Sequence, residues 1–186
     1  AYSTRAVTAT SGLDYQDASG TATFAPGTTL VEIPITVAAD TIDESDESLL
    51  FELGVVTNAT AADTQVTVTI FDDDQTWISV GDAAALERDD TTTSATFLVS
   101  LSRPNSASVL VDWRSVAGSA TPGADYVEQS GTLAFPPGMT QETVAIQVLG
   151  DRLPERDETF AILLSNPRSA AIEDPEGAGR ILDDDR

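Results

Sequence analysis

The feature that most constrains this chain is an internal repeat. Asp14-Tyr15 recurs as Asp125-Tyr126, and the acidic run Asp72–Asp74 recurs as Asp183–Asp185, in both cases 111 positions later. The patterns S-G-T, F-x-P-G and E-x-D-E recur at the same spacing. A repeat of this length has the size of a whole domain, so the chain is expected to contain tandem domains rather than a solenoid.

The two copies are not equally complete. The repeat spacing aligns Tyr2 with Trp113, so residues 77–111 have no counterpart in the first copy. We therefore predict a partial domain over residues 1–74 and a complete domain over residues 75–186. Either preceding residues of a longer protein supply the missing strands, or another copy of the chain donates them and the chains polymerise head to tail. The first account is favoured because the first copy begins inside a strand pattern.

Short stretches of alternating apolar residues predict strands in both copies. They lie at residues 31–37, 66–70, 97–101, 109–113, 144–148 and 160–164. Turn signals such as Pro26-Gly27 and Pro137-Gly138 separate them, and no convincing amphipathic helix is found. About seven short strands in roughly 110 residues are typical of an immunoglobulin-like sandwich. The predicted fold class is all-β, with tandem immunoglobulin-like β-sandwiches of which the first is truncated at its N-terminus.

The composition excludes several kinds of chemistry. The 186 residues include 31 acidic and 9 basic side chains, giving a net charge of −22, and there is no His and no Cys. Disulfides, Cys/His zinc sites and Ser-His-Asp triads are therefore impossible. A surface this acidic repels nucleic acid, and the apolar runs are too short to span a bilayer. Aromatic residues make up only 6%, too few for a typical sugar-binding cleft, so the chain is predicted not to be an enzyme.

Acidic residues gather where predicted strands end, in three clusters per copy. Strands crossing a sandwich bring alternate loops to the same end, and converging carboxylates repel one another unless a cation neutralises them. Many flexible oxygen ligands favour Ca²⁺ over Mg²⁺ or zinc. Two alternatives to a bound cation stay open: a single acidic run is usually a solvated surface, and a Lys-free, Asp-rich composition also resembles that of proteins from salty environments.

The motifs of the second copy resemble those of Calx-beta domains. The resemblance rests on the D-Y pair at Asp125, S-G-T-x-x-F-x-P-G from Ser130, D-E-T-F ending at Phe160 and I-L-D-D-D from Ile181. It covers the second copy and most of the first. Calx-beta domains are calcium-binding modules of sodium–calcium exchangers, integrin β4 and many bacterial surface proteins. The resemblance implies a seven-stranded sandwich that binds Ca²⁺ at one end through loop carboxylates.

The resemblance also implies a set of metal ligands. In the first copy they are Asp14, Asp40, Glu44, Glu47, Asp72, Asp73 and Asp74; in the second they are Glu87, Asp125, Asp151, Glu155, Glu158, Asp183, Asp184 and Asp185. The first copy has no equivalent of Glu87. Gly150-Asp151 and Ala39-Asp40 stand where strong binders in the family often have an acidic pair. Fewer or weaker sites are expected as a result.

Two functions fit these observations. The favoured one is a structural repeat of a large extracellular or cell-surface protein, an adhesin or filament, in which Ca²⁺ rigidifies domain ends and linkers and the partners are neighbouring domains of the same protein. The alternative is a regulatory calcium sensor attached to another functional domain. Asn58-Ala59-Thr60 has the form of an N-glycosylation sequon.

Overall fold

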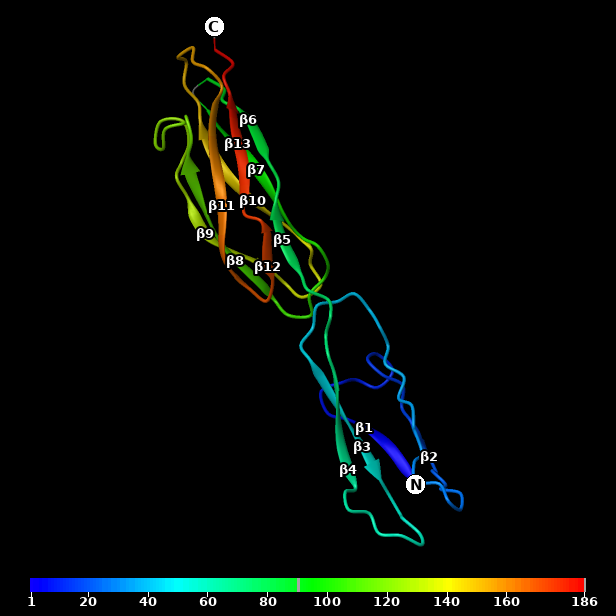
Figure 1. Cartoon of the computed structure of the whole chain (residues 1–186). Coiled ribbons are helices and arrows are strands. Elements are labelled where there is room, and N and C mark those ends of the chain that lie inside the picture. The colour runs from blue at the N-terminus through cyan, green and yellow to red at the C-terminus, as the bar shows by residue number, and fades with distance from the viewer. Residues whose placement is uncertain (90, 186) are drawn as a thin grey trace. The chain divides into compact units, whose positions relative to one another are not determined.

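The computed structural model describes residues 1–89 and 91–185. They form two compact units, Ala1–Asp73 and Asp74–Arg186 (Figure 1). All regular secondary structure in the described residues is β-strand, which confirms the all-β prediction. None of these residues belongs to a helix long and apolar enough to cross a membrane.

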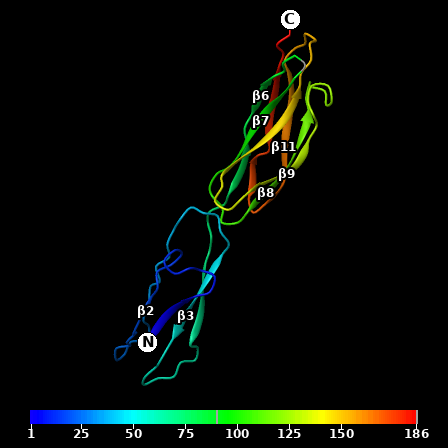
Figure 2. The same ribbon diagram turned by 180° about the vertical axis from the view of Figure 1, so that it is seen from behind.

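The second unit is a sandwich of two sheets, visible from both sides in Figures 1 and 2. One sheet has the order β10 (Gln141–Leu149), β7 (Thr92–Leu101), β5 (Trp77–Val80) and β12 (Ala171–Asp174). The other has the order β6 (Ala83–Leu86), β13 (Glu176–Leu182), β11 (Glu158–Arg168), β8 (Val109–Ala117) and β9 (Ser130–Phe135). Strands β12 and β5 pair in parallel, as do β13 and β6.

Alternating side chains of both sheets fill the core of the second unit. In β7, for example, Ala95, Phe97 and Val99 are buried while the residues between them face solvent. Phe160 of β11 stacks on Tyr126 at a centroid distance of 4.8 Å and meets Phe97 edge-on at 5.7 Å. The four strands predicted in this copy are confirmed, because each places its apolar positions in this core.

The first unit has a single sheet in the order β2 (Ser19–Gly20), β1 (Tyr2–Ala6), β3 (Glu47–Leu53) and β4 (Gln65–Ile70). At the repeat spacing these strands correspond to parts of β9, β8, β11 and β13. The buried core of this unit consists only of Ala9, Tyr15 and Leu49, with Ile35, Val68 and Ile70 packed partly against it. The first copy therefore builds the equivalent of one sheet of the sandwich.

The strand predicted at residues 31–37 is wrong. Among the described residues this segment makes only an isolated bridge between Val37 and Tyr15. Its counterpart in the second copy is β10, which pairs along its whole length with β7. Residues 1–73 contain no counterpart of β7, so the segment lacks the neighbour that would complete its ladder. Its alternating burial nevertheless persists, with Val31, Ile33 and Ile35 half-buried.

The two units fill one core position in different ways. In the second unit Phe160 lies opposite Gly179, and a Cβ added at Gly179 would lie 2.6 Å from the ring. In the first unit the equivalent pair is Leu49 opposite Val68. A large ring thus faces glycine in the second unit, whereas two residues of intermediate size face each other in the first.

Candidate calcium site

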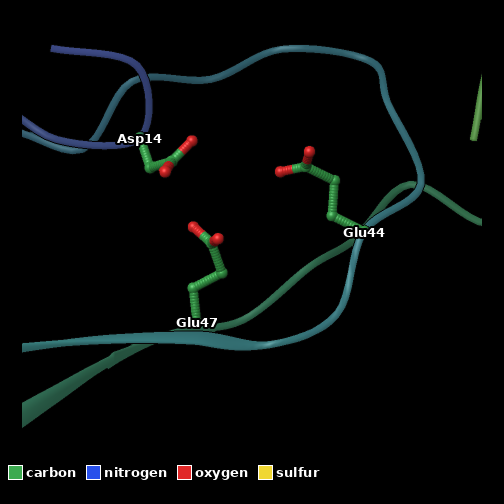
Figure 3. Close-up of side chains that lie close together, drawn as sticks. All are labelled: Asp14, Glu44 and Glu47. Carbon is green, nitrogen blue, oxygen red and sulfur yellow. The ribbon is translucent and has the colours of Figure 1, made fainter. Parts of the chain in front are cut away.

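Three carboxylates from separate points of the chain meet at one end of each unit. In the first unit Asp14 lies in the loop between β1 and β2, Glu44 precedes β3, and Glu47 is its first residue; Figure 3 shows their side chains pointing toward one another. One oxygen from each lies within 4.8 Å of the others. The second unit repeats this arrangement with Asp125, Glu155 and Glu158. We call these two groups the first and second triads.

The aspartate of each triad is held by its own loop. The backbone N–H of Thr10 donates to Asp14 Oδ2 at 2.6 Å, and that of Thr121 donates to Asp125 Oδ2 at the same distance. The next residue in each copy, Tyr15 or Tyr126, is fully buried and anchors the loop to the core. One oxygen of each aspartate is therefore committed to its loop, which fixes the orientation of the carboxylate.

Crowding changes the protonation of the triads. Burial, followed by a hydrogen bond with Asp14, raises the pKa of Glu47 to about 7. Burial and a hydrogen bond with Asp125 raise the pKa of Glu158 to about 7 in the same way. Burial and the charge of Asp40 raise the pKa of Glu44 as well. Without a cation, Glu47 and Glu158 are therefore only partly ionised near neutral pH.

Glu87 is a further buried acid that feels the charges of the second triad, although it lies outside the group whose oxygens are within 4.8 Å of one another. It follows β6, is only 5% exposed, and its backbone N–H donates to Leu182 O at 2.9 Å. Burial raises its pKa to about 7, with further contributions from the charges of Asp151, Glu155 and Asp183. The segment that carries Glu87 has no counterpart in the first copy, so the two sites differ in composition.

Four other predicted residues border the triads. Asp40 and Asp151 each cap their loop, since Asp40 Oδ1 accepts the N–H of Ile42 and Asp151 Oδ1 accepts that of Leu153. Asp183 Oδ2 accepts the backbone N–H of Glu155 at 3.3 Å, and Asp72 likewise accepts that of Glu44. These acids support the loops that carry the triad glutamates.

The remaining residues of the acidic runs Asp72–Asp74 and Asp183–Asp185 differ in the groups with which they interact. Asp73 contributes its charge beside Asp72. Asp74 forms an ion pair with Arg103 of the second unit, which commits its carboxylate elsewhere. Asp184 accepts the N–H of Arg88 at 2.8 Å. Burial and a hydrogen bond with Asp89 raise the pKa of Asp185.

Three acids outside the predicted ligand set also make hydrogen bonds in these loops. Asp46 Oδ1 accepts the N–H of Asp72 at 3.1 Å, and Asp157 Oδ1 accepts the N–H of Asp183 at 3.3 Å. Both are the aspartate of the repeated E-x-D-E pattern, and this repeat could have identified them from the sequence. Asp89 gave no such signal, because it lies in the segment that does not repeat.

The departure from the family pattern at Gly150 has a steric cause. A Cβ at this position would overlap the carbonyl oxygen of Arg88, which turns the chain with a φ of 72°. No acidic side chain fits there while the chain follows this path. The first copy has Ala39 at the equivalent position, and none of its residues is equivalent to Arg88. The acid is thus missing from both copies, but only the second copy shows the steric reason.

The donor set fits calcium. Carboxylate oxygens bind Ca²⁺ at about 2.4 Å, and oxygens around a common ion at that distance lie no more than about 4.8 Å apart. Each triad satisfies this limit. Neither triad contains nitrogen or sulfur, which zinc and other transition metals prefer. Fold and site together define a tandem pair of β-domains that bind calcium at one end through loop carboxylates.

Comparison with known proteins identifies the family. The Calx-beta domain family matches residues 1–74 and residues 72–186, so the chain belongs to this family. Sodium/calcium exchanger 1 of Canis lupus familiaris is 27% identical over 181 residues, 87% of this chain. Sodium/calcium exchanger 2 of Homo sapiens is 41% identical over 73 residues, 38% of this chain and 8% of the exchanger. The chain spans only 19% of the length of exchanger 1.

A solved structure supports the same assignment. The apo form of the Calx CBD1 domain is 27% identical and superposes with a TM-score of 0.52, covering 60% of this chain and 100% of that domain. The predictions of a Calx-beta fold and of Ca²⁺ as the bound ion are confirmed. The predicted extracellular or cell-surface location is wrong, because the matched relatives are sodium/calcium exchangers and Calx domains. The similarity to these exchangers and to the Calx domain does not support an adhesin or a surface filament.

Proposed function

We propose that the two units form a calcium sensor that regulates another domain of the same polypeptide, at an intracellular location. The observation that carries this proposal is the similarity to sodium/calcium exchanger 1 over 87% of the chain, together with an equivalent carboxylate triad in each unit. The neighbouring domains of the intact protein are the expected partners. The chain acts as a binding module and not as an enzyme.

The carboxylates provide the switch. At low calcium, Glu47 and Glu158 hold protons beside Asp14 and Asp125, and within each unit the remaining acids of the triad repel one another. Ligation by these carboxylates releases the protons and draws the loops together. A local change in charge at a domain end is a common means of biasing a larger conformational equilibrium.

The two sites should respond at different calcium concentrations. The second triad has Glu87 nearby as an additional buried carboxylate, and Asp125 is itself buried. More anionic ligands and a more rigid surrounding raise calcium affinity. We expect the second site to bind more tightly than the first, so that the tandem senses calcium over a wider range than one site does.

Calorimetric calcium titration of chelator-treated protein tests the binding. Asp14→Asn should abolish the weaker class of site and Asp125→Asn the tighter class, whereas Asp63→Asn, exposed and outside both triads, should change neither. Trp77 and Trp113 are the only tryptophans and both lie in the second unit. A change in their fluorescence during the titration therefore assigns one class of calcium site to the second unit. The absence of any binding heat at millimolar calcium would contradict calcium binding.

The regulatory role needs the intact protein. Asp125→Asn should shift the calcium concentration that half-activates or half-inhibits the attached domain by at least about tenfold, equivalent to about 1.4 kcal/mol of lost binding free energy. Asp63→Asn is the matched control. An unchanged calcium response in a variant that has lost its tight site contradicts regulation, while leaving calcium binding intact.

A further inference from the structure

The second unit has a polar cavity outside its calcium site. The cavity has a volume of about 350 Å³ and is lined by Arg114, Ser115, Glu128, Gln129 and Ser130. The first two residues belong to β8, the last begins β9, and the other two directly precede β9. None of the five is among the predicted calcium ligands. A cavity of this volume lies in the size range of small-molecule sites, so its chemistry deserves a separate argument.

The wall of the cavity is held by hydrogen bonds that need no ligand. Ser115 is only 2% exposed. Its Oγ accepts the N–H of Gln129 at 2.9 Å and donates to Gln129 O at 3.2 Å, and its own N–H donates to the same carbonyl at 2.8 Å. Arg114 lies directly opposite Ser130 in the β8–β9 ladder. The lining residues are therefore placed by the sheet before any ligand arrives, which lowers the entropy cost of binding.

Two opposite charges line the cavity without pairing. Among the described residues neither Arg114 nor Glu128 takes part in an ion pair, although both line the same cavity. Other exposed arginines of the second unit do pair, since Arg168 contacts Asp112 at 3.2 Å and Arg180 contacts an aspartate at 2.7 Å. A guanidinium binds a carboxylate, and a carboxylate binds an ammonium group. The cavity thus offers one partner for each charge of a zwitterion.

The charge of Glu128 extends to the edge of the core. Burial, followed by the charge of Glu128, raises the pKa of the fully buried Tyr126. The Tyr126 hydroxyl has no hydrogen-bond partner among the described residues. An ammonium group bound at Glu128 would offset a negative charge that the neighbouring protein groups leave uncompensated.

The first unit has the same hydrogen-bonded wall without the two opposite charges. Thr4 stands at the position of Ser115, and its Oγ1 accepts the N–H of Ala18 at 2.9 Å. Ser3 stands where the second unit has Arg114, and Asp17 stands where it has Glu128. The wall therefore belongs to both units, whereas the arginine belongs to the second unit alone. The first unit is an internal control for any ligand that needs the guanidinium.

We propose that this cavity binds a small zwitterion of the amino-acid class, with its carboxylate on Arg114 and its ammonium group on Glu128. The hydroxyl of Ser130 and the side-chain amide of Gln129 are further polar groups of the lining. A simple anion fits less well, because Glu128 and the net charge of −22 repel it. A zwitterion has no net charge and avoids this penalty. The site needs no calcium and is separate from the proposed sensor function.

Amide NMR of the full chain in chelator tests the proposal. The probes are glycine, β-alanine and 4-aminobutanoate, which differ in the distance between their two charges. At least one should shift the amides of Ser115 and Ser130 in a saturable way, with a dissociation constant of about 1 mM or below. Acetate and methylammonium, which each carry one of the two charges, should bind at least about tenfold more weakly. The equivalent amides of the first unit, Thr4 and Ser19, should not shift.

Substitutions assign the two ends of the ligand. Arg114→Gln and Glu128→Gln should each weaken the best zwitterion at least about tenfold, whereas Arg114→Lys, which keeps the charge, should retain most of the affinity. Arg168→Gln is the matched control, because this arginine is exposed and pairs with Asp112 outside the cavity. All four variants should bind calcium as the natural chain does, so a failure here leaves the sensor function untouched.

Three results would overturn the proposal. The first is the absence of a saturable shift with every zwitterion at about 50 times the expected dissociation constant. The second is acetate binding as tightly as the best zwitterion, which would show a simple anion site. The third is unchanged zwitterion affinity in Arg114→Gln or in Glu128→Gln, which would place the ligand elsewhere.

Discussion

Replacing Glu87 with glutamine separates two roles of a buried carboxylate. The substitution keeps the shape and removes the charge. Burial and four neighbouring acids raise the pKa of Glu87 from 4.5 to about 7. Each unit of pKa difference corresponds to about 1.4 kcal/mol, so the charged form costs the calcium-free fold about 3 kcal/mol at pH 8.

The size of the effect depends on pH and on calcium. Because the folded-state pKa is raised, the contribution of Glu87 to stability is fully present below about pH 4.5 and is lost as the pH rises through about 7. Glu87→Gln should therefore stabilise the calcium-free second unit by up to about 3 kcal/mol at pH 8, and by little near pH 4.5. In calcium this gain should shrink to near zero, because the variant lacks a ligand and loses up to the whole stabilisation by binding, about 2.7 kcal/mol at 100 times the dissociation constant.

Urea unfolding followed by tryptophan fluorescence measures the stability of the second unit directly, since both tryptophans lie in that unit. The matched control is Glu176→Gln, an exposed glutamate at the opposite end of β13 from Asp183. It should leave the midpoint unchanged in chelator and in calcium. A loss of stability on Glu87→Gln in chelator at pH 8 would refute the assignment of Glu87 as a repelled buried carboxylate. An equal gain in calcium would refute its assignment as a ligand.

Three further predictions follow from the geometry. Calcium affinity should fall at least about tenfold from pH 8 to pH 6, because Glu47 and Glu158, with pKa values of about 7, must release protons on binding. Calorimetry in two buffers of different ionisation enthalpy should show this proton release. Equal binding heats in the two buffers would contradict it. Asp72→Asn should weaken the first site and Asp74→Asn should not, because Asp74 pairs with Arg103; equal losses of affinity would show that the triplet acts as one ligand group. Gly179→Val should cost about 1–3 kcal/mol by overpacking, and Phe160→Leu should recover at least about 1 kcal/mol of it by recreating the pair found in the first unit; additive urea midpoints would show that the two positions are independent.

Local patterns predicted the strands of the second copy because each apolar stripe has a neighbour to pack against. The same alternation at residues 31–37 predicted a strand that does not form, since strand pairing depends on a partner elsewhere in the chain. The triads were predictable because their acids recur at one spacing. The different interactions of Asp73 and Asp74 were not predictable, because a run of three aspartates does not show that an arginine from another loop pairs with one of them.

The resemblance to Calx-beta domains predicted features that local sequence patterns did not, but it did not explain features that have a steric origin. It implied Glu87 as a ligand, which stays a prediction, and the structure shows this side chain buried and under the influence of the charges of Asp125 and Glu155. It also marked Gly150 as a departure without explaining it. The cause is the carbonyl oxygen of Arg88, which occupies the space that a side chain would need. A close approach between two loops distant in sequence leaves no periodic signal.

The first unit shows that the triad and the complete sandwich are separable. Its three carboxylates come together although its described residues form one sheet and bury only a small core. The loop of Asp14 is fixed by Tyr15 and by its own backbone, while Glu47 begins the central strand β3. All three positions therefore depend on the sheet that is present. In the second unit, the segment without a counterpart adds Glu87, whose pKa is raised by burial and by the charges of nearby acids, so we expect this segment to strengthen a site whose triad does not depend on it.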